Sequence, residues 1–326
     1  MRYIALCVIL LISLDVRALV LSSIKPIDLI VRDLTAGEPA SFVLLGASAS
    51  PHHYSMKMSD ARRLMESDVF IWVGPELEAF LTKPVRNRVS PTLTLSELFD
   101  DDDKSTHQAH DDEPSDESDH EAGHENGHEN HHHDHEHGHH GANDSHIWLS
   151  YDNAVVIAKQ LAETLSKRYP QFESQFNENL KALVSQLQSE KALTSEIFDQ
   201  IKSKGLAVYH DGYSAYVNEF GLVQLAHVTQ IPDEQISLKK LMTLKHELAG
   251  ASCLLGEEAE FTRVKRFAQK LGVRPVAVDL LGLSVDRSRD KTHFVQYMSN
   301  IRDSFVSCLS EKSVANTNVG NAVSSE

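Results

Sequence analysis

The 326-residue chain has few cysteines, a shortage of basic residues, and no long apolar run beyond its N-terminus. Lys and Arg number 31 against 47 Asp and Glu, which gives a formal charge of −16. Nucleic acids and anionic membrane surfaces attract an excess of positive charge, so this balance argues against both as partners. The length and the 41% of apolar residues predict a globular protein with two ordinary domains.

The most one-sided composition lies in residues 100–145, which contain no Val, Ile, Leu, Met, Phe, Trp, Tyr or Cys. This stretch holds 16 acidic residues, 12 of the 19 histidines of the chain, and a single base, Lys104. The rest of the chain has 30 basic and 31 acidic residues and is therefore nearly neutral. A segment without apolar side chains cannot offset the entropy of ordering, so we predict a solvated, disordered loop.

The N-terminus predicts a signal peptide over residues 1–18. Arg2 is followed by an apolar run over residues 3–14, which is too short to span a bilayer comfortably. Val16 and Ala18 occupy the −3 and −1 positions of a cleavage site. We therefore expect an exported mature protein without a transmembrane helix.

Only three cysteines are present, and the first, Cys7, would leave with the signal peptide. The remaining pair, Cys253 and Cys308, would form one disulfide in an exported protein. In the chain-entropy model, closing a loop of this length with a disulfide would stabilise the fold by about 4 kcal/mol. The alternative is two buried free thiols.

Apolar periodicity predicts alternating strands and helices on both sides of a helical middle section. The predicted strands cover residues 19–23, 42–45, 69–73, 206–210, 223–228, 253–255 and 275–279. The predicted helices cover residues 26–34, 59–65, 76–81, 151–168, 172–201, 213–220, 238–249, 261–271 and 293–308. The helix over 172–201 is longer than one small domain needs, which indicates a strut between two lobes.

The predicted fold is therefore α/β, with two lobes that each contain a mostly parallel sheet flanked by helices. One long rigid helix joins the lobes, and a cleft lies between them. We assign residues 19–150 to the N-terminal lobe, including the acidic loop, and residues 151–204 to the helical segment. Residues 205–310 form the C-terminal lobe, and residues 311–326 form a disordered tail.

Seven histidines lie outside the loop, and three of them occupy comparable positions. His52 follows a predicted strand, His146 lies at the exit of the loop, and His210 ends a strand, as does Asp279. Ligands of open parallel sheets bind beyond the carboxyl ends of strands, so these side chains should converge on the cleft. Three imidazoles and one carboxylate suit tetrahedral Zn²⁺.

Several motifs make the mature chain resemble a known family. They are SSIKP (22–26), GASASPHHYSMKMSD (46–60), WVGPELEAF (72–80), HIWL (146–149), HDGYSAYVNEFGL (210–222), residues 227–229 and DLLG (279–282). The chain is similar to the periplasmic zinc-binding receptors of bacterial ABC importers, within the metal-receptor class of solute-binding proteins. An acidic, His-rich loop before the HIWL motif is typical of the zinc branch of that class.

The resemblance implies that His52, His146 and His210 are the imidazole ligands. It implies that Asp279 is a nearby carboxylate that completes the shell or orients it. The residue at 210 bears on the metal, because a carboxylate there is typical of manganese receptors whereas His favours zinc. Pro51 and His53 flank His52 where the family often has an acidic residue, so the fourth ligand would be Asp279, His53 or water.

Other histidines are candidates for auxiliary metal binding. His227 ends a strand, although a structural role is the simpler interpretation. The loop mixes imidazoles and carboxylates, and its candidate ligands are His131, His133, His135, His137 and His139. Tethered beside a tight site, they would raise the local metal concentration. We expect His246 and His293 to lie on the surface. Glu257 is a candidate for a position near the cleft, although favourable charge at a helix N-terminus is the simpler interpretation.

The resemblance implies a monomeric, non-enzymatic receptor that takes Zn²⁺ as transported ligand. It would deliver the ion to an inner-membrane permease driven by a cytoplasmic ATPase. The alternatives are a manganese receptor, a zinc buffer or chaperone acting through the loop, and a zinc hydrolase. The H-E-x-x-H patterns at 120–124 and 124–128 do not support the hydrolase, because they lie among Gly and Asn rather than on a helix.

Overall fold

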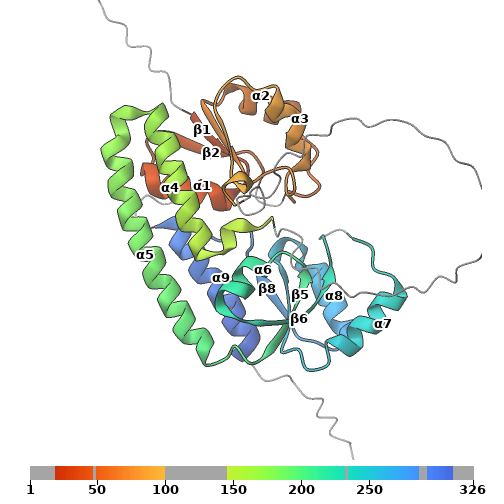
Figure 1. Ribbon diagram of the computed structural model, residues 1–326. Coiled ribbons are helices and arrows are strands. Elements are labelled where there is room, and N and C mark those ends of the chain that lie inside the picture. The colour runs from red at the N-terminus through yellow and green to blue at the C-terminus, as the bar shows by residue number, and fades with distance from the viewer. Residues whose placement is uncertain (1–18, 47–48, 100–144, 232–233, 286–291, 311–326) are drawn as a thin grey trace, which may run out of the picture.

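The computed structural model describes residues 19–46, 49–99, 145–231, 234–285 and 292–310. The predicted signal peptide, most of the acidic loop with its five candidate histidines, and the predicted tail therefore lie outside the described residues. The described strands form two four-stranded parallel sheets, with the orders β2-β1-β3-β4 and β6-β5-β7-β8. This arrangement confirms the predicted α/β class with two lobes (Figure 1).

The N-terminal sheet carries the first strands and helices of the chain. Its strands are β1 (Leu19–Ser22), β2 (Ala40–Val43), β3 (Val69–Trp72) and β4 (Thr92–Thr94). Its helices are α1 (Lys25–Thr35), α2 (Met58–Glu66) and α3 (Thr82–Arg86). Every residue of β3 is buried, as expected of a central parallel strand.

The helix predicted over 76–81 is wrong in its position. The backbone turns at Gly74 with a φ of +152°, and only a 3₁₀ turn, Ala79–Leu81, precedes α3. The buried Glu78 carboxylate accepts hydrogen bonds from the amides of Val73 (2.8 Å) and Gly74 (3.3 Å). These bonds fold the chain back at the end of β3, so the helix begins later than its apolar pattern indicated.

The C-terminal sheet has the same parallel layout. Its strands are β5 (Gly205–His210), β6 (Val223–Thr229), β7 (Leu254–Glu257) and β8 (Pro275–Val278). Its flanking helices are α6 (Ser214–Phe220), α7 (Leu238–Glu247), α8 (Phe261–Leu271) and α9 (His293–Ser310). The predicted disulfide is confirmed, because Cys253 and Cys308 are bonded with their Cα atoms 5.4 Å apart.

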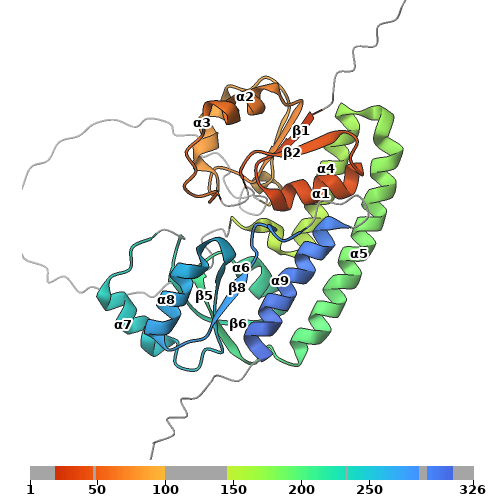
Figure 2. The ribbon, with the colours of Figure 1, turned by 180° about the vertical axis from the view of Figure 1, so that it is seen from behind.

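The predicted long helix is confirmed as α5 (Glu173–Asp199), and α9 runs beside it. Helix α4 (Tyr151–Arg168) leads to α5, whose 27 residues span about 40 Å. Helix α9 packs against α5, against β8 and against α1 of the other lobe. Both views show α5 and α9 side by side along one flank of the molecule (Figure 2).

The start of α9 is attached to the N-terminal lobe by Asp33 of α1. Its carboxylate accepts hydrogen bonds from the amides of His293 and Phe294, both at 2.8 Å, and lies 2.8 Å from Nδ1 of His293. The expectation that His293 lies on the surface is therefore wrong, because this residue is buried between the lobes. A capping carboxylate supplied by a distant helix leaves no signal in the sequence around His293.

Candidate metal centre

Three imidazoles from three separate parts of the chain meet between the lobes. One nitrogen from each of His52, His146 and His210 lies within 4.8 Å of the other two. His146 and His210 are buried, and His52 is partly exposed. The sequence therefore identified three side chains that the fold does bring together.

Each imidazole is positioned by a different local structure. His210 is the last residue of β5, so the sheet fixes its backbone. His52 lies in the turn between β2 and α2. His146 directly precedes a short 3₁₀ turn, η3 (Ile147–Leu149), which leads into α4.

The spacing of the nitrogens suits a small tetrahedral cation. The Nε2 atoms of His146 and His210 lie 3.4 Å apart. Zinc–nitrogen bonds of about 2.05 Å in a tetrahedron place neighbouring nitrogens about 3.3 Å apart. The ring centroid of His52 lies 5.4 Å from that of His146 and 5.9 Å from that of His210, so one ion can contact all three rings.

The electrostatics keep His52 in the form that binds a metal. Burial, followed by the neighbouring His146 and His210, lowers the pKa of His52 to about 3. Its Nε2 is buried and has no hydrogen-bond partner among the described residues. A neutral imidazole with an uncommitted lone pair is the state that a metal requires.

Glu257 orients the His210 ring from the opposite side. Its Oε1 lies 3.0 Å from Nδ1 of His210, which leaves Nε2 directed toward the other imidazoles. Burial alone would raise the pKa of Glu257, but its hydrogen bond to His210 and the nearby imidazoles lower it overall. A carboxylate on the far nitrogen fixes the tautomer of a ligating His and increases its basicity.

Gly212 allows both rings to approach the same point. A Cβ atom at this position would lie 2.8 Å from Cε1 and 2.9 Å from Nδ1 of His146, and closer still to Nε2 of His210. A side chain here would therefore enter the space between two of the three imidazoles. The glycine of the HDG sequence is required for this close approach, not for an unusual backbone angle.

The other described candidate ligands are not part of the group whose ligand atoms lie within 4.8 Å of one another. The Asp279 carboxylate accepts hydrogen bonds from the amides of Leu283 and Ser284, both at 2.7 Å, and from the Ser284 hydroxyl at 2.6 Å. His53 is exposed, and its ring centroid lies 6.5 Å from that of His52. His227 lies on β6, with its Nδ1 3.7 Å from Oδ2 of Asp211.

Glu257 belongs to the site, which was the less favoured of its two interpretations from the sequence. Its position ahead of a helix favours a role as helix-terminal charge. Glu257 also ends β7, which pairs in parallel with β5, and the carboxyl ends of paired parallel strands lie together. Strand β7 neighbours β5 and ends in a carboxylate. That position was the sequence signal that could have identified Glu257 as part of the site.

Comparison with known proteins agrees with this geometry. A family profile described as the periplasmic zinc-uptake complex component A, ZnuA, matches residues 20–308. The chain belongs to the ZnuA family. It is 32% identical over 309 residues to the high-affinity zinc uptake system protein ZnuA of Yersinia pestis, covering 90% of this chain and 91% of that protein. The ZnuA protein of Haemophilus ducreyi is 34% identical over 303 residues, with 90% and 93% covered.

Solved structures show the same fold at lower identity. The periplasmic zinc-binding protein TroA of Treponema pallidum superposes with a TM-score of 0.69 at 16% identity, covering 90% of this chain and 99% of that chain. A zinc-bound ZnuA deletion mutant superposes with a TM-score of 0.63 at 17% identity, covering 90% and 98%. These likenesses establish the shared ZnuA and TroA architecture.

Membership in the ZnuA family confirms several predictions from the sequence. The family is a periplasmic binding component of zinc uptake, so the chain is a transport receptor and not an enzyme. No helix in the described part of the chain combines the length and hydropathy needed to cross a bilayer.

Proposed function

We propose that this protein captures Zn²⁺ with His52, His146 and His210 and delivers it to an inner-membrane ABC permease driven by a cytoplasmic ATPase. The observation that carries the proposal is the convergence of three imidazole nitrogens between two lobes, within 4.8 Å of one another. The zinc-uptake relatives support the choice of cargo. We propose that the receptor acts as a monomer.

Water is the fourth ligand in this proposal. Asp279 already accepts three hydrogen bonds from its own loop, and His53 is exposed, with its ring centroid 6.5 Å from that of His52. An open fourth position lets the ion exchange ligands when it is handed on, because no protein group has to leave first.

Zinc is favoured over manganese because the donor set is made of imidazoles. Manganese prefers carboxylate, carbonyl and water oxygens, whereas imidazole suits zinc. Competition between the two ions on the mature chain tests this choice. We expect a large excess of Mn²⁺ to leave bound Zn²⁺ in place, and displacement by equimolar Mn²⁺ would contradict the proposal.

The acidic loop provides weaker sites that gather the ion, including His131, His133, His135, His137 and His139. Calorimetry on the chain lacking residues 107–140 should retain one tight zinc site and lose the weaker ones. If the tight site also disappears, the loop is the binding element, as in a zinc buffer. His210→Ala in the full mature chain gives the reverse test, because a buffer that acts through the loop would retain its tight binding.

A further inference from the structure

His146 is the ligand whose position needs explanation, because it belongs to neither sheet. It precedes η3 and α4. The described structure on its N-terminal side begins at Ser145. The position of its ring therefore depends on whatever holds the start of α4.

The start of α4 is held by a carboxylate from the C-terminal lobe. Glu219 of α6 accepts hydrogen bonds from the amide of Tyr151 at 2.8 Å and from the amide of Asp152 at 3.1 Å. It also accepts one from the Ser150 hydroxyl at 3.3 Å, and that hydroxyl accepts from the Asn153 amide at 3.2 Å. Together, Ser150 and Glu219 satisfy the first three free amides of the helix.

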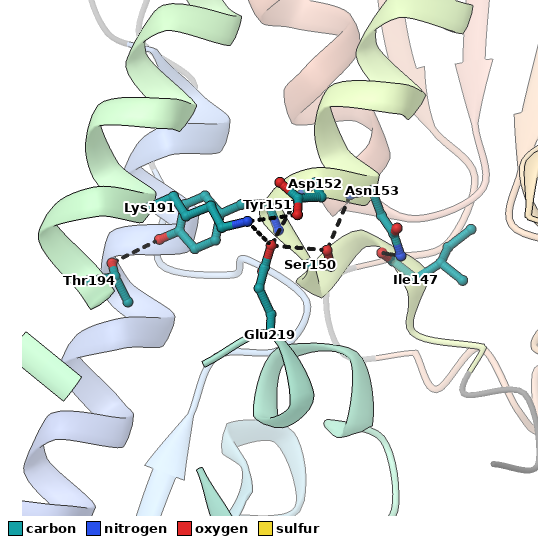
Figure 3. A network of polar contacts seen from close by, with 8 residues as sticks. All are labelled: Ile147, Ser150, Tyr151, Asp152, Asn153, Lys191, Thr194 and Glu219. Atoms are coloured by element: carbon teal, nitrogen blue, oxygen red, sulfur yellow. Dashed lines mark hydrogen bonds and ion pairs between the residues drawn. The ribbon is translucent and has the colours of Figure 1, made fainter. Parts of the chain in front are cut away.

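Lys191 of α5 holds the capping carboxylate in place. Its Nζ lies 3.0 Å from Oε1 of Glu219 and 2.7 Å from Oδ2 of Asp152. The side chain of Glu219 is only 7% exposed, so its charge needs a partner. Figure 3 shows the three helices α4, α5 and α6 meeting at this network.

Short connections extend from the helix start to the ligand. Asn153 donates from Nδ2 to the carbonyl oxygen of Ile147 at 3.1 Å (Figure 3). The amide of Leu149 donates to the carbonyl oxygen of His146 at 3.1 Å. On the other side of η3, Trp148 donates from Nε1 to the Tyr297 hydroxyl at 3.0 Å. These bonds link the start of α4 to the backbone that carries His146.

We propose that Glu219, supported by Lys191, is a positioning residue for the metal ligand His146. Glu219 does not itself coordinate the ion. It connects α6 of the C-terminal lobe to the segment that carries His146. The positions of His146 and His210 are therefore both fixed relative to the C-terminal lobe. This inference rests on the proposed function, because it requires His146 to be a zinc ligand.

The test compares zinc affinity with stability in the full mature chain. Glu219→Gln keeps the shape of the side chain but removes its charge and directs an amide group at the helix amides. We expect zinc affinity, measured by competition with a chelating dye, to fall about tenfold, at the lower end of outer-shell effects. Glu163→Gln is the matched control, since Glu163 pairs with Lys167 on the exposed face of α4, and it should leave the affinity unchanged.

A purely structural role predicts a different result. It would lower the unfolding free energy of the metal-free and zinc-bound forms equally and leave the affinity unchanged. The visible absorption bands of the Co²⁺-loaded protein provide a second measurement, and positioning by Glu219 predicts that Glu219→Gln shifts them. Lys191→Met should weaken zinc binding in the same direction, and Lys191→Arg should restore it. If Glu219→Gln fails to fold, these two variants decide the question.

The outcomes also separate this inference from the function on which it rests. If His146→Ala loses tight zinc binding while Glu219→Gln binds within twofold of the natural chain, Glu219 does not position the ligand. If His146→Ala binds zinc normally, the proposed ligand set is wrong.

Discussion

The two lobes hold their imidazoles in different ways. His210 ends β5, a strand hydrogen-bonded on both sides, and Glu257 anchors its far nitrogen. His52 lies in a turn, partly exposed, and its Nε2 has no hydrogen-bond partner in the described residues. The C-terminal half of the site is therefore prearranged for the ion, whereas fewer hydrogen bonds fix the N-terminal half. Prearrangement lowers the cost of binding, so equal substitutions in the two halves should have unequal effects.

Removing an imidazole from the prearranged half should have the largest effect. We expect His210→Ala to weaken zinc binding about a thousandfold, since zinc sites supply about 10–16 kcal/mol across four ligands. His52→Ala should cost about a hundredfold, because part of the binding energy of this less constrained ligand is spent on ordering it. Competition titrations with a zinc chelator would measure both affinities. Equal losses would remove the distinction between the two halves.

Filling the space beside the rings should have the next largest effect. Gly212→Ala places a methyl group against His146 and His210, and we expect a loss of zinc affinity of about a hundredfold. Gly46→Ala in the N-terminal lobe is the matched control, because an added Cβ would meet no atom of the described residues within 4 Å. Isothermal titration of both variants with Zn²⁺ makes the comparison. Normal binding by Gly212→Ala would show that the rings move apart freely.

The carboxylate behind His210 should matter less than the ring itself. Glu257→Gln keeps the shape of the side chain but removes the charge that fixes the tautomer of His210. We expect zinc affinity to fall about tenfold, as is typical of outer-shell partners. Glu258→Gln, at the adjacent position, should have no effect in the same dye-competition assay. An unchanged affinity in Glu257→Gln would mean that the sheet alone orients the ring.

The smallest effect concerns the pH dependence of the metal-free protein. The pKa of His52 is about 3 in the folded state, against 6.5 for an unperturbed imidazole, so the unfolded chain binds more protons between these values. Stability should therefore fall as pH decreases through this window, by about 0.8 kcal/mol between about pH 7.5 and pH 6. Urea denaturation with a chelator present would measure this loss. His52→Asn should flatten the dependence, and an identical slope would show that other groups cause it.

The fold and the three imidazoles were predictable because each depends on local pattern and parallel topology. Buried apolar runs such as residues 69–73 identify strands, and the strand ends place His52 and His210 beyond the carboxyl edges of their own sheets, which face the same cleft. The partners of those residues were not predictable in the same way. Glu219 caps α4 from 67 to 69 residues away, and Asp33 caps α9 from about 260 residues away. These carboxylates meet the helix amides only once the chain has folded, so no local sequence pattern indicates the contacts.

The attachments of α9 have a mechanical consequence. One end of this helix is fixed to α1 by Asp33, and the other is joined covalently to the start of β7 through Cys308 and Cys253. With α5 beside it, the two lobes and two struts form a closed frame. Two lobes joined by one helix can rotate about its ends. With two helices attached to both lobes, the lobes move apart only if one of these attachments is broken. Reducing the disulfide therefore removes one joint and should loosen the lobes without touching any metal ligand.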